Sequence, residues 1–347
     1  MFKKKQHSAS VVGLDLDPSH IAAAEVHVNG GVSVTRGAVA PLRPGILRDG
    51  EAADPSALAA ALKELFDAND LPRRVRLGIA NQRIVVRSLD LPVIEDPKGL
   101  AAAVHHSAPD HIPMPIDEAV VDFQSLGVVD TPQGPRSRVV IVAVRREMIE
   151  KLVAATREAG LEVEGIDLAA FGMVRALAPA ATEQAVLYVN VAGLTNVAVA
   201  NASGCLFTRA AAGGLDGAVN TLSERRGLTT EHARQWMQHV GLLTPVEDLE
   251  GDPELLAAAR TALEEGVHQL ADTVRNSLNF YRTQEGAETV ERALVTGPAI
   301  AIPGFVEKLA EQLKLPVEPA FVMVDGEQEL DPSRLAVAAG LAIEDRA

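Results

Sequence analysis

Two strand-to-turn segments carry the residue types that could bind a metal ion and phosphate groups. Asp15 lies at the end of a predicted buried strand and precedes a turn at residues 17–19, and Asn190 precedes a second turn that runs to residue 196. A carboxylate in such a place can hold a hydrated Mg²⁺ ion, and the N–H groups of a turn can bind phosphate. Two turns of this kind that face each other across a cleft would enclose a nucleotide.

Glycine turns elsewhere could complete such a site. Thr296 and Gly297 precede a predicted helix, and helix N-termini favour anions and polar ligands. Each segment also has an ordinary structural interpretation, because aspartate after a strand and a pair such as Gly213-Gly214 are common in turns. Their order and spacing together favour the binding interpretation.

The two candidate segments belong to similar three-stranded units. Strands are predicted over 11–16, 21–28 and 32–40 in the first unit, and over 185–191, 196–201 and 205–210 in the second. Asp15 lies 15 residues before the turn glycine Gly30, and Asn190 lies 14 residues before Gly204. Asn and Gly tolerate the positive φ that tight hairpins require. The two units therefore indicate an internal duplication.

The remaining pattern predicts a mixed α/β protein. Apolar spacing and caps predict helices over 55–68, 97–107, 147–159, 216–226, 253–282, 305–313 and 332–343, and one more that Thr230 can cap. Further strands are predicted over 75–79, 84–89, 119–129, 138–144 and 292–296. A chain of 347 residues is long enough for two or more domains.

Composition excludes several classes of function. The net charge of −15 disfavours binding to nucleic acid. The single cysteine, Cys205, rules out an internal disulfide and a Cys-rich zinc site. No apolar run reaches the roughly 18 residues that span a bilayer, and no segment reads as a signal peptide, so we expect any membrane association to go through a partner.

Conventional catalytic motifs are also missing from the sequence. It contains no Walker P-loop, Rossmann GxGxxG, GxSxG or HExxH motif. His105, His106 and His111 match no common zinc spacing and are interpreted as surface histidines.

Four groups of residues point to a known family. Residues 42–50 read LRPGILRDG, residues 111–124 read HIPMPIDEAVVDFQ, and residues 275–282 read RNSLNFYR. The fourth group is residues 159–161, which read AGL, followed by Ile166-Asp167 and Phe171. In their order along the chain, and with the duplicated units, they resemble the PilM family of type IV pilus assembly proteins. That family is related to the cell-division protein FtsA, and the Ile-Pro and Asn-Phe-Tyr-Arg segments favour PilM over FtsA. The resemblance runs from about residue 11 to 320.

The resemblance implies a fold and a layout. We expect the actin-like ATPase fold, with duplicated ribonuclease-H-like domains and an inserted small α/β subdomain. Subdomain 1A would comprise residues 1–40 and 146–182, and subdomain 1C would comprise 41–145. Subdomain 2A would comprise 183–215 and 288–347, and subdomain 2B would comprise 216–287. The expected nucleotide contacts are Asp15, Asp17, Ser19, His20, Asn190, Gly193, Thr195, Asn196, Gly213, Gly214, Gly297 and Pro298.

The resemblance also implies partners and a location. PilM proteins bind the cytoplasmic N-terminal peptide of the membrane protein PilN in a groove between subdomains 1A and 1C, and they couple to the pilus motor ATPases. We therefore expect a cytoplasmic scaffold at the inner face of the cytoplasmic membrane, with ATP and Mg²⁺ as possible ligands and Asp15 as the Mg²⁺ ligand.

The sequence departs from the family at all four nucleotide-contacting segments. Asp17 stands where the first turn usually has glycine, and Asn190 replaces the carboxylate of the second turn. Arg234 and Met237 stand where a Glu and a Lys usually contact the nucleoside, and Pro298 follows Gly297 where further glycine is usual. Phosphoryl transfer depends on positioned and neutralised phosphates, so we expect weak or absent ATP hydrolysis.

Two other functions remain open at this stage. An active actin-like ATPase or small-molecule kinase would use Asp15 as its catalytic or metal-positioning carboxylate. An FtsA-like cell-division adaptor would require a C-terminal amphipathic membrane helix, whereas residues 341–347 are short and acidic.

Overall fold

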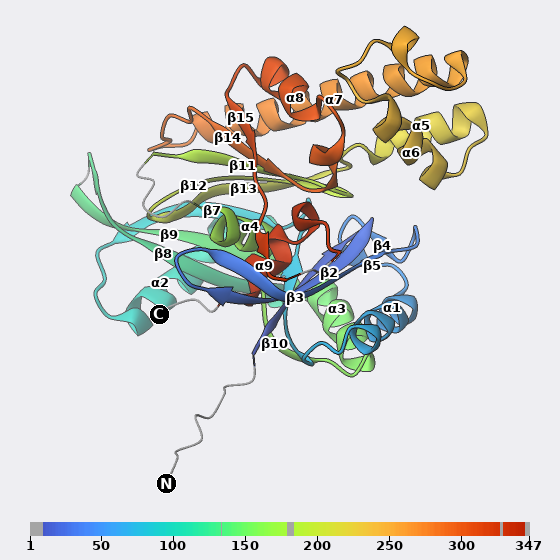
Figure 1. Cartoon of the computed structure of the whole chain (residues 1–347). Helices are drawn as coiled ribbons and strands as arrows, with labels where there is room; N and C mark the ends of the chain where they lie inside the picture. The colour runs from blue at the N-terminus through green and yellow to red at the C-terminus, as the bar shows by residue number, and fades with distance from the viewer. Residues whose placement is uncertain (1–9, 133, 179–183, 327–328, 344–347) are drawn as a thin grey trace.

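The two predicted three-stranded units belong to two separate sheets, one in each lobe of the molecule (Figure 1). The computed structural model describes residues 10–132, 134–178, 184–326 and 329–343. The first sheet has the order β10-β6-β1-β2-β3-β16. Its strands are β1 (Val12–Asp17), β2 (His20–Val28), β3 (Val32–Pro41), β6 (Arg74–Ile79), β10 (Glu162–Leu168) and β16 (Met323–Val324).

The second sheet repeats the pairing of the first. Its order is β13-β12-β11-β14-β15, with β11 (Val186–Val191), β12 (Leu194–Asn201), β13 (Gly204–Ala212), β14 (Ala293–Thr296) and β15 (Val317–Pro319). β1 is antiparallel to β2 and parallel to β6, and β11 is antiparallel to β12 and parallel to β14. Asp15 pairs with Gly78 and Asn190 pairs with Thr296, each in the parallel ladder. The two residues therefore hold equivalent positions.

Two crossed helices, α4 (Ala169–Leu177) and α9 (Ala336–Ala342), lie between the sheets (Figure 1). They cross at glycines, since a Cβ on Gly340 would lie 1.7 Å from the carbonyl oxygen of Gly172. Helix α9 also packs on β1, where a Cβ on Gly13 would lie 1.9 Å from the carbonyl oxygen of Ala338. Helix α9 therefore helps to hold the first sheet against the second lobe.

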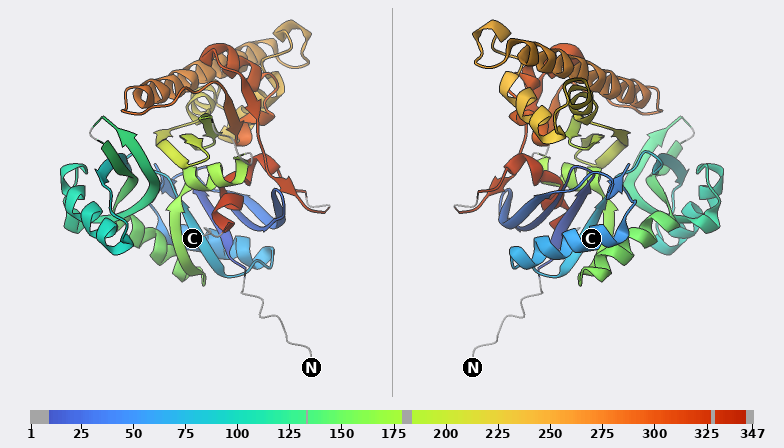
Figure 2. Two further views of the ribbon diagram at one scale, coloured as in Figure 1. Left: turned by 90° about the vertical axis from the view of Figure 1, so that its left-hand side faces the viewer. Right: turned by 90° about the vertical axis from the view of Figure 1, so that its right-hand side faces the viewer.

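An inserted unit of three strands projects from the first lobe (teal in Figure 2). It has the order β7-β9-β8, with β7 (Val85–Pro92), β8 (Ala119–Thr131) and β9 (Gly134–Arg145), and α2 (Pro97–Ser107) packs on it. Strands β7 and β8 are both edges of this small sheet.

Outer helices cover the remaining faces. α1 (Pro55–Ala68) and α3 (Arg146–Glu158) contribute to the core of the first lobe. α5 (Asp216–Arg226), α6 (Thr230–Val240), α7 (Pro253–Arg282) and α8 (Phe305–Leu313) pack on the second sheet. Prolines at the first turns of α1 and α7 follow the capping carboxylates of Asp54 and Asp252. No helix within these described ranges combines the length and the apolarity needed to cross a bilayer.

Several local features differ from the sequence-based prediction. Thr229, not Thr230, caps α6, because its side chain accepts the N–H of His232. The helix predicted over 332–343 is a 3-10 turn, Pro332–Arg334, followed by α9. Strand β6 belongs to the first sheet, although the predicted range of the inserted subdomain includes it. The short hairpin of β4 (Leu47–Arg48) and β5 (Glu51–Ala52) was not predicted, and residues 344–347 lie outside the described residues.

Candidate functional site

The carboxylate of Asp17 joins the turns of the two lobes. Its Oδ1 accepts the backbone N–H of Gly193 at 2.9 Å, and its Oδ2 accepts that of Leu194 at 3.0 Å. The same Oδ1 accepts the backbone N–H of Ser19 at 2.9 Å and the Ser19 hydroxyl at 2.5 Å. The two N–H groups of the second turn that a bound phosphate would need are therefore bonded to a carboxylate of the protein.

The surroundings of Asp17 keep it ionised. Burial raises its pKa, but hydrogen bonds from His20, Ser19 and the N–H of Leu194 outweigh burial, so the pKa lies below its ordinary value. His20 Nδ1 lies 3.5 Å from Asp17 Oδ1 and 3.0 Å from the Ser19 hydroxyl. His20 is buried, and its Nε2 has no hydrogen-bond partner within the described part of the chain.

The pKa of Asp15 is shifted in the opposite direction to that of Asp17. Burial raises its pKa to about 7, the positive charge of His20 lowers it, and the nearby carboxylate of Asp17 raises it further. At neutral pH this carboxyl group is therefore protonated in a large fraction of the molecules. Binding of Mg²⁺ to this carboxyl group would release the proton, because the metal binds the anionic form.

The second and third predicted segments meet beside Asn190. A Cβ on Gly297, which has a φ of +97°, would lie 2.6 Å from Asn190 Oδ1 and 2.5 Å from the carbonyl oxygen of Val191. The N–H of Gly297 is donated to the carbonyl of Ser333 at 3.1 Å. Pro298 starts a 3-10 helix of four residues, Pro298–Ala301, rather than an α-helix. The expected helix N-terminus is therefore absent from this turn.

The other predicted residues pack around the second turn. The Thr195 hydroxyl donates to the carbonyl of Gly213 at 2.9 Å, and a Cβ on Gly214 would lie 2.3 Å from the carbonyl oxygen of Ala192. Gly193 packs against the Asp17 side chain, whose Oδ1 would lie 2.5 Å from an added Cβ. Asn196 is buried in a separate hollow with Asn81 and Arg209.

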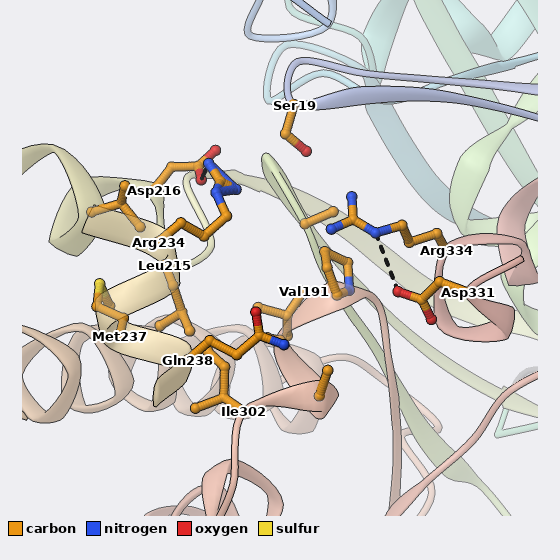
Figure 3. Close-up of a pocket in the computed structure, with 15 residues that line it drawn as sticks. Ser19, Val191, Leu215, Asp216, Arg234, Met237, Gln238, Ile302, Asp331 and Arg334 are labelled. Carbon is orange, nitrogen blue, oxygen red and sulfur yellow. Dashed lines mark hydrogen bonds and ion pairs between the residues drawn. The ribbon is translucent and has the colours of Figure 1, made fainter. Parts of the chain in front are cut away.

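A cavity opens between the lobes next to these turns (Figure 3). Its volume is about 110 Å³, below the roughly 300–1,000 Å³ of most small-molecule sites. Of the twelve predicted contacts, Ser19 and Pro298 line it, together with Arg234 and Met237. Sequence analysis missed Asp216, Gln238, Asp331 and Arg334, which also line it.

The cavity's two arginines are paired with carboxylates. Arg234 lies 3.0 Å from Asp216, and Arg334 lies 3.2 Å from Asp331 (Figure 3). Burial raises the pKa of Asp216, Arg234 lowers it, and Asp17 raises it further. These charges balance inside the cavity, so the arginines are already neutralised without a bound anion. The described residues contain no cluster of three metal-ligating side chains. The N–H groups of the second turn and the two arginines of the cavity thus already have partners within the protein.

A separate groove lies between the inserted unit and the first lobe. It has a volume of about 460 Å³, and it is lined by residues of β8, β9, β10, α3 and α4. Its walls present Val120, Phe123, Ile166 and Phe171, and the ion pair of Asp167 with Arg175, 2.5 Å apart, lies at its side. Strands β8 and β10 are edges of their sheets, so both walls carry strand edges.

Comparisons with known proteins agree with this architecture. The family model for type IV pilus assembly protein PilM matches residues 13–346. A solved chain of the PilM-PilN type IV pilus biogenesis complex has a TM-score of 0.77 at 25% identity, covering 96% of this chain and 97% of that chain.

More distant solved structures share the fold alone. Ethanolamine utilization protein EutJ from Carboxydothermus hydrogenoformans has a TM-score of 0.56 at 13% identity, covering 98% of this chain and 91% of its own. MreB5 of Spiroplasma citri bound to ADP has a TM-score of 0.56 at 13% identity, covering 96% and 95%. The predicted actin-like ATPase fold is confirmed, and the chain belongs to the family of type IV pilus assembly protein PilM.

Proposed function

We propose that this protein is a cytoplasmic scaffold of type IV pilus assembly that docks the cytoplasmic tail of a PilN-like inner-membrane protein. Membership of the PilM family and the similarity to a chain of the PilM-PilN complex support this role. The protein would thus lie at the inner face of the cytoplasmic membrane through its partner, and the pilus motor ATPases would be further partners.

The groove between β8 and β10 is the observation that carries the docking role. Edge strands have unpaired N–H and C=O groups, and an extended peptide can add to such an edge while its alternate side chains enter pockets. The apolar walls at Val120, Ile166 and Phe171 would take apolar side chains of the tail. The nearby carboxylate of Asp122 and the pair of Asp167 with Arg175 would take its polar groups.

We propose further that the cleft between the lobes is a fixed joint rather than a hydrolytic site. The Asp17 carboxylate accepts the N–H groups of Gly193 and Leu194, and the arginines of the cavity are paired, which supports this proposal. Binding of ATP would require the displacement of this buried anion or would place phosphate charge next to it, and both cost free energy. ATP and Mg²⁺ would therefore bind weakly, if they bind, and hydrolysis is not needed for docking.

The docking role is tested by titration with a peptide of the PilN-like protein's cytoplasmic tail, taken from the same organism. Val120→Glu places a charge in the groove and is expected to weaken binding at least tenfold. Val128→Glu is the matched control, because Val128 lies on the same strand, is 60% exposed and does not line the groove. Equal affinities for the two variants would overturn the assignment of the groove.

The proposal for the cleft is tested by turnover. Purified protein with Mg-ATP is expected to release phosphate no faster than buffer alone. Robust hydrolysis that Asp15→Ala abolishes would show an active ATPase and overturn the fixed joint, and it would leave the docking proposal untouched.

A further inference from the structure

A basic groove runs along the opposite edge of the inserted unit, between β7 and β13. It has a volume of about 660 Å³ and lies apart from both the cleft cavity and the β8–β10 groove. It continues along β7 into a hollow of about 450 Å³ that shares Arg87 and Phe280 with it. Strand β7 belongs to the inserted unit and β13 to the second lobe (Figure 1).

The charge of this groove is opposite to that of the whole molecule. The protein has a net charge of −15, yet the described residues that line the groove include Arg83, Arg87, Arg145 and Arg209 and no Asp or Glu. Arg83 lies 3.2 Å from Glu51. Within the described part of the chain, no carboxylate lies at ion-pair distance from the other three arginines. Three guanidinium groups therefore remain available to anionic partners.

The same groove exposes large apolar side chains. The Phe280 side chain on α7 is 47% exposed, and its ring centroid lies 6.1 Å from that of Phe207 on β13. Pro113 and Met114 form part of the other wall. Phe, Met and Arg are the side chains enriched at protein interfaces, and Arg and aromatic residues supply much of their binding energy. Residues of the segments 111–124 and 275–282 thus line the same groove. Both segments carry the sequence resemblance to the PilM family.

The backbone of the groove suits an extended chain. Among the described residues, β7 pairs with β9 alone and β13 with β12 alone, so each is an edge strand of its sheet. β7 has eight residues, which corresponds to a bound segment of roughly 26 Å at about 3.3 Å per residue. Toward one end, Asp90 pairs with Arg138 at 2.8 Å and Glu285 lies near, so anionic groups of a partner would bind at the end with the four arginines.

We propose that this groove docks an extended, acidic segment of a partner protein, whose carboxylates bind Arg87, Arg145 and Arg209 and whose apolar side chains contact Phe280 and Met114. Arginine bonds carboxylates with two parallel N–H donors, which gives such contacts direction as well as strength. The surface goes beyond the proposed docking of a PilN-like tail and does not depend on it. Nucleic acid is disfavoured, because its long phosphate backbone would meet the acidic surface around the groove.

The test measures fluorescence anisotropy of a labelled peptide of alternating Glu and Leu, about eight residues long, with the full-length protein. Matched peptides with Lys or Gln in place of Glu are the probe controls. The Glu peptide is expected to bind, to weaken as salt rises toward about 0.3 M, and to lose at least tenfold in affinity with the double variant Arg87→Glu/Arg209→Glu. Arg43→Glu, an exposed arginine outside the groove, is expected to leave the affinity unchanged.

The outcomes separate the alternatives. Equal loss with Arg43→Glu, equal binding of the Lys peptide, or no binding by the wild-type protein would each overturn the proposal. If the double variant instead changes only the sedimentation of the protein alone, the groove is a contact between copies of this chain and the proposal is wrong. The milder pair Arg87→Gln/Arg209→Gln, with a far-ultraviolet circular dichroism spectrum equal to wild type, covers the case in which charge reversal disturbs folding, and it is expected to weaken the Glu peptide as well.

Discussion

At the scale of single residues, Asp17 determines whether the N–H groups of the second turn are available to a ligand in the cleft. Its carboxylate takes two N–H groups from a turn 176 residues away, and it remains ionised although it is buried. A glycine at this place would leave those N–H groups to a ligand. The Asp17 side chain is therefore one of the contacts that join the lobes, beside the packing of α4 and α9 between the sheets.

Removal of the Asp17 carboxylate should expose a latent anion site. Asp17→Ala leaves the buried N–H groups of Gly193 and Leu194 without acceptors, so the free energy of unfolding should fall by about 2–4 kcal/mol. Inorganic phosphate should raise the melting temperature of this variant and not that of the wild type, because it can replace the lost acceptor. Thermal unfolding with and without phosphate measures both effects.

Asp54→Ala is the control for this prediction. Asp54 also accepts a backbone N–H, from Ala57 at 3.0 Å, but the group it would release is at the surface and can bond to water. Its loss should cost about 1 kcal/mol with no response to phosphate. A similar response to phosphate in both variants would contradict the role given to Asp17.

Asp15 should make the protein less stable as the pH rises toward neutrality. The folded protein holds the Asp15 proton up to about pH 7, whereas the unfolded chain releases it near 3.8, so folding takes up a proton between these values. Stability then falls as pH rises through this window. Asp15→Asn removes the titration, so the variant should gain about 3 kcal/mol over wild type between pH 5 and pH 8, from two pKa units at about 1.4 kcal/mol each.

Urea unfolding in metal-free buffer measures this gain. Asp17 acts in the opposite direction at lower pH, because its lowered pKa gives stability that is lost only as pH falls below about 4, outside this range. A constant difference between Asp15→Asn and wild type from pH 5 to pH 8 would show that Asp15 is ionised throughout.

At the scale of elements, local patterns predicted much of the fold. Helices Pro55–Ala68, Pro97–Ser107, Asp216–Arg226, Pro253–Arg282 and Phe305–Leu313 begin and end where apolar spacing and caps predicted. Both three-stranded units are confirmed, because their turns carry Asn and Gly at the required places. Strand β10 and helix α4 were not predicted, since short segments with mixed polarity give no clear period.

The missed features share a physical cause. The place of β6 between β1 and β10, and of α9 between the sheets, depends on contacts between residues far apart in the chain. The bond from Gly193 to Asp17 depends on how the two lobes meet. The sequence predicted that Asp17 adds negative charge at the first turn, but residue types alone carry no information on which N–H groups that charge would meet.

The crossing of α4 and α9 should tolerate no side chain at its glycines. A Cβ on Gly340 would lie 1.7 Å from the Gly172 carbonyl oxygen, so Gly340→Ala should force the helices apart. The free energy of unfolding should fall by about 3 kcal/mol, the upper end of the range for overpacked cores. Gly217→Ala is the control, because Gly217 is on α5, is exposed and has no atom within 4 Å of its Cβ position. That change should stabilise by up to about 1 kcal/mol. Denaturant unfolding would contradict the close crossing if both variants were equally stable.

At the scale of the whole molecule, the two proposed docking grooves depend differently on the joint between the lobes. The β8–β10 groove is built from the inserted unit, the first lobe and helix α4, and no strand of the second sheet lines it. The β7–β13 groove has one wall on the inserted unit and the other on the second lobe. A change in the joint should therefore affect the second groove more than the first.

Loosening of the joint should separate the two binding activities. Asp17→Ala removes the carboxylate that ties Gly193 and Leu194 to the first lobe, so we expect β13 to move more readily relative to β7. A groove whose walls move is less preorganised, and the ordering of the walls on binding reduces the affinity for the ligand. The acidic peptide should then bind severalfold more weakly to the variant, whereas the tail of the PilN-like protein should keep its wild-type affinity. Parallel titrations of both peptides measure this difference, and an equal change in the two affinities would show that the lobes and the inserted unit respond as one body.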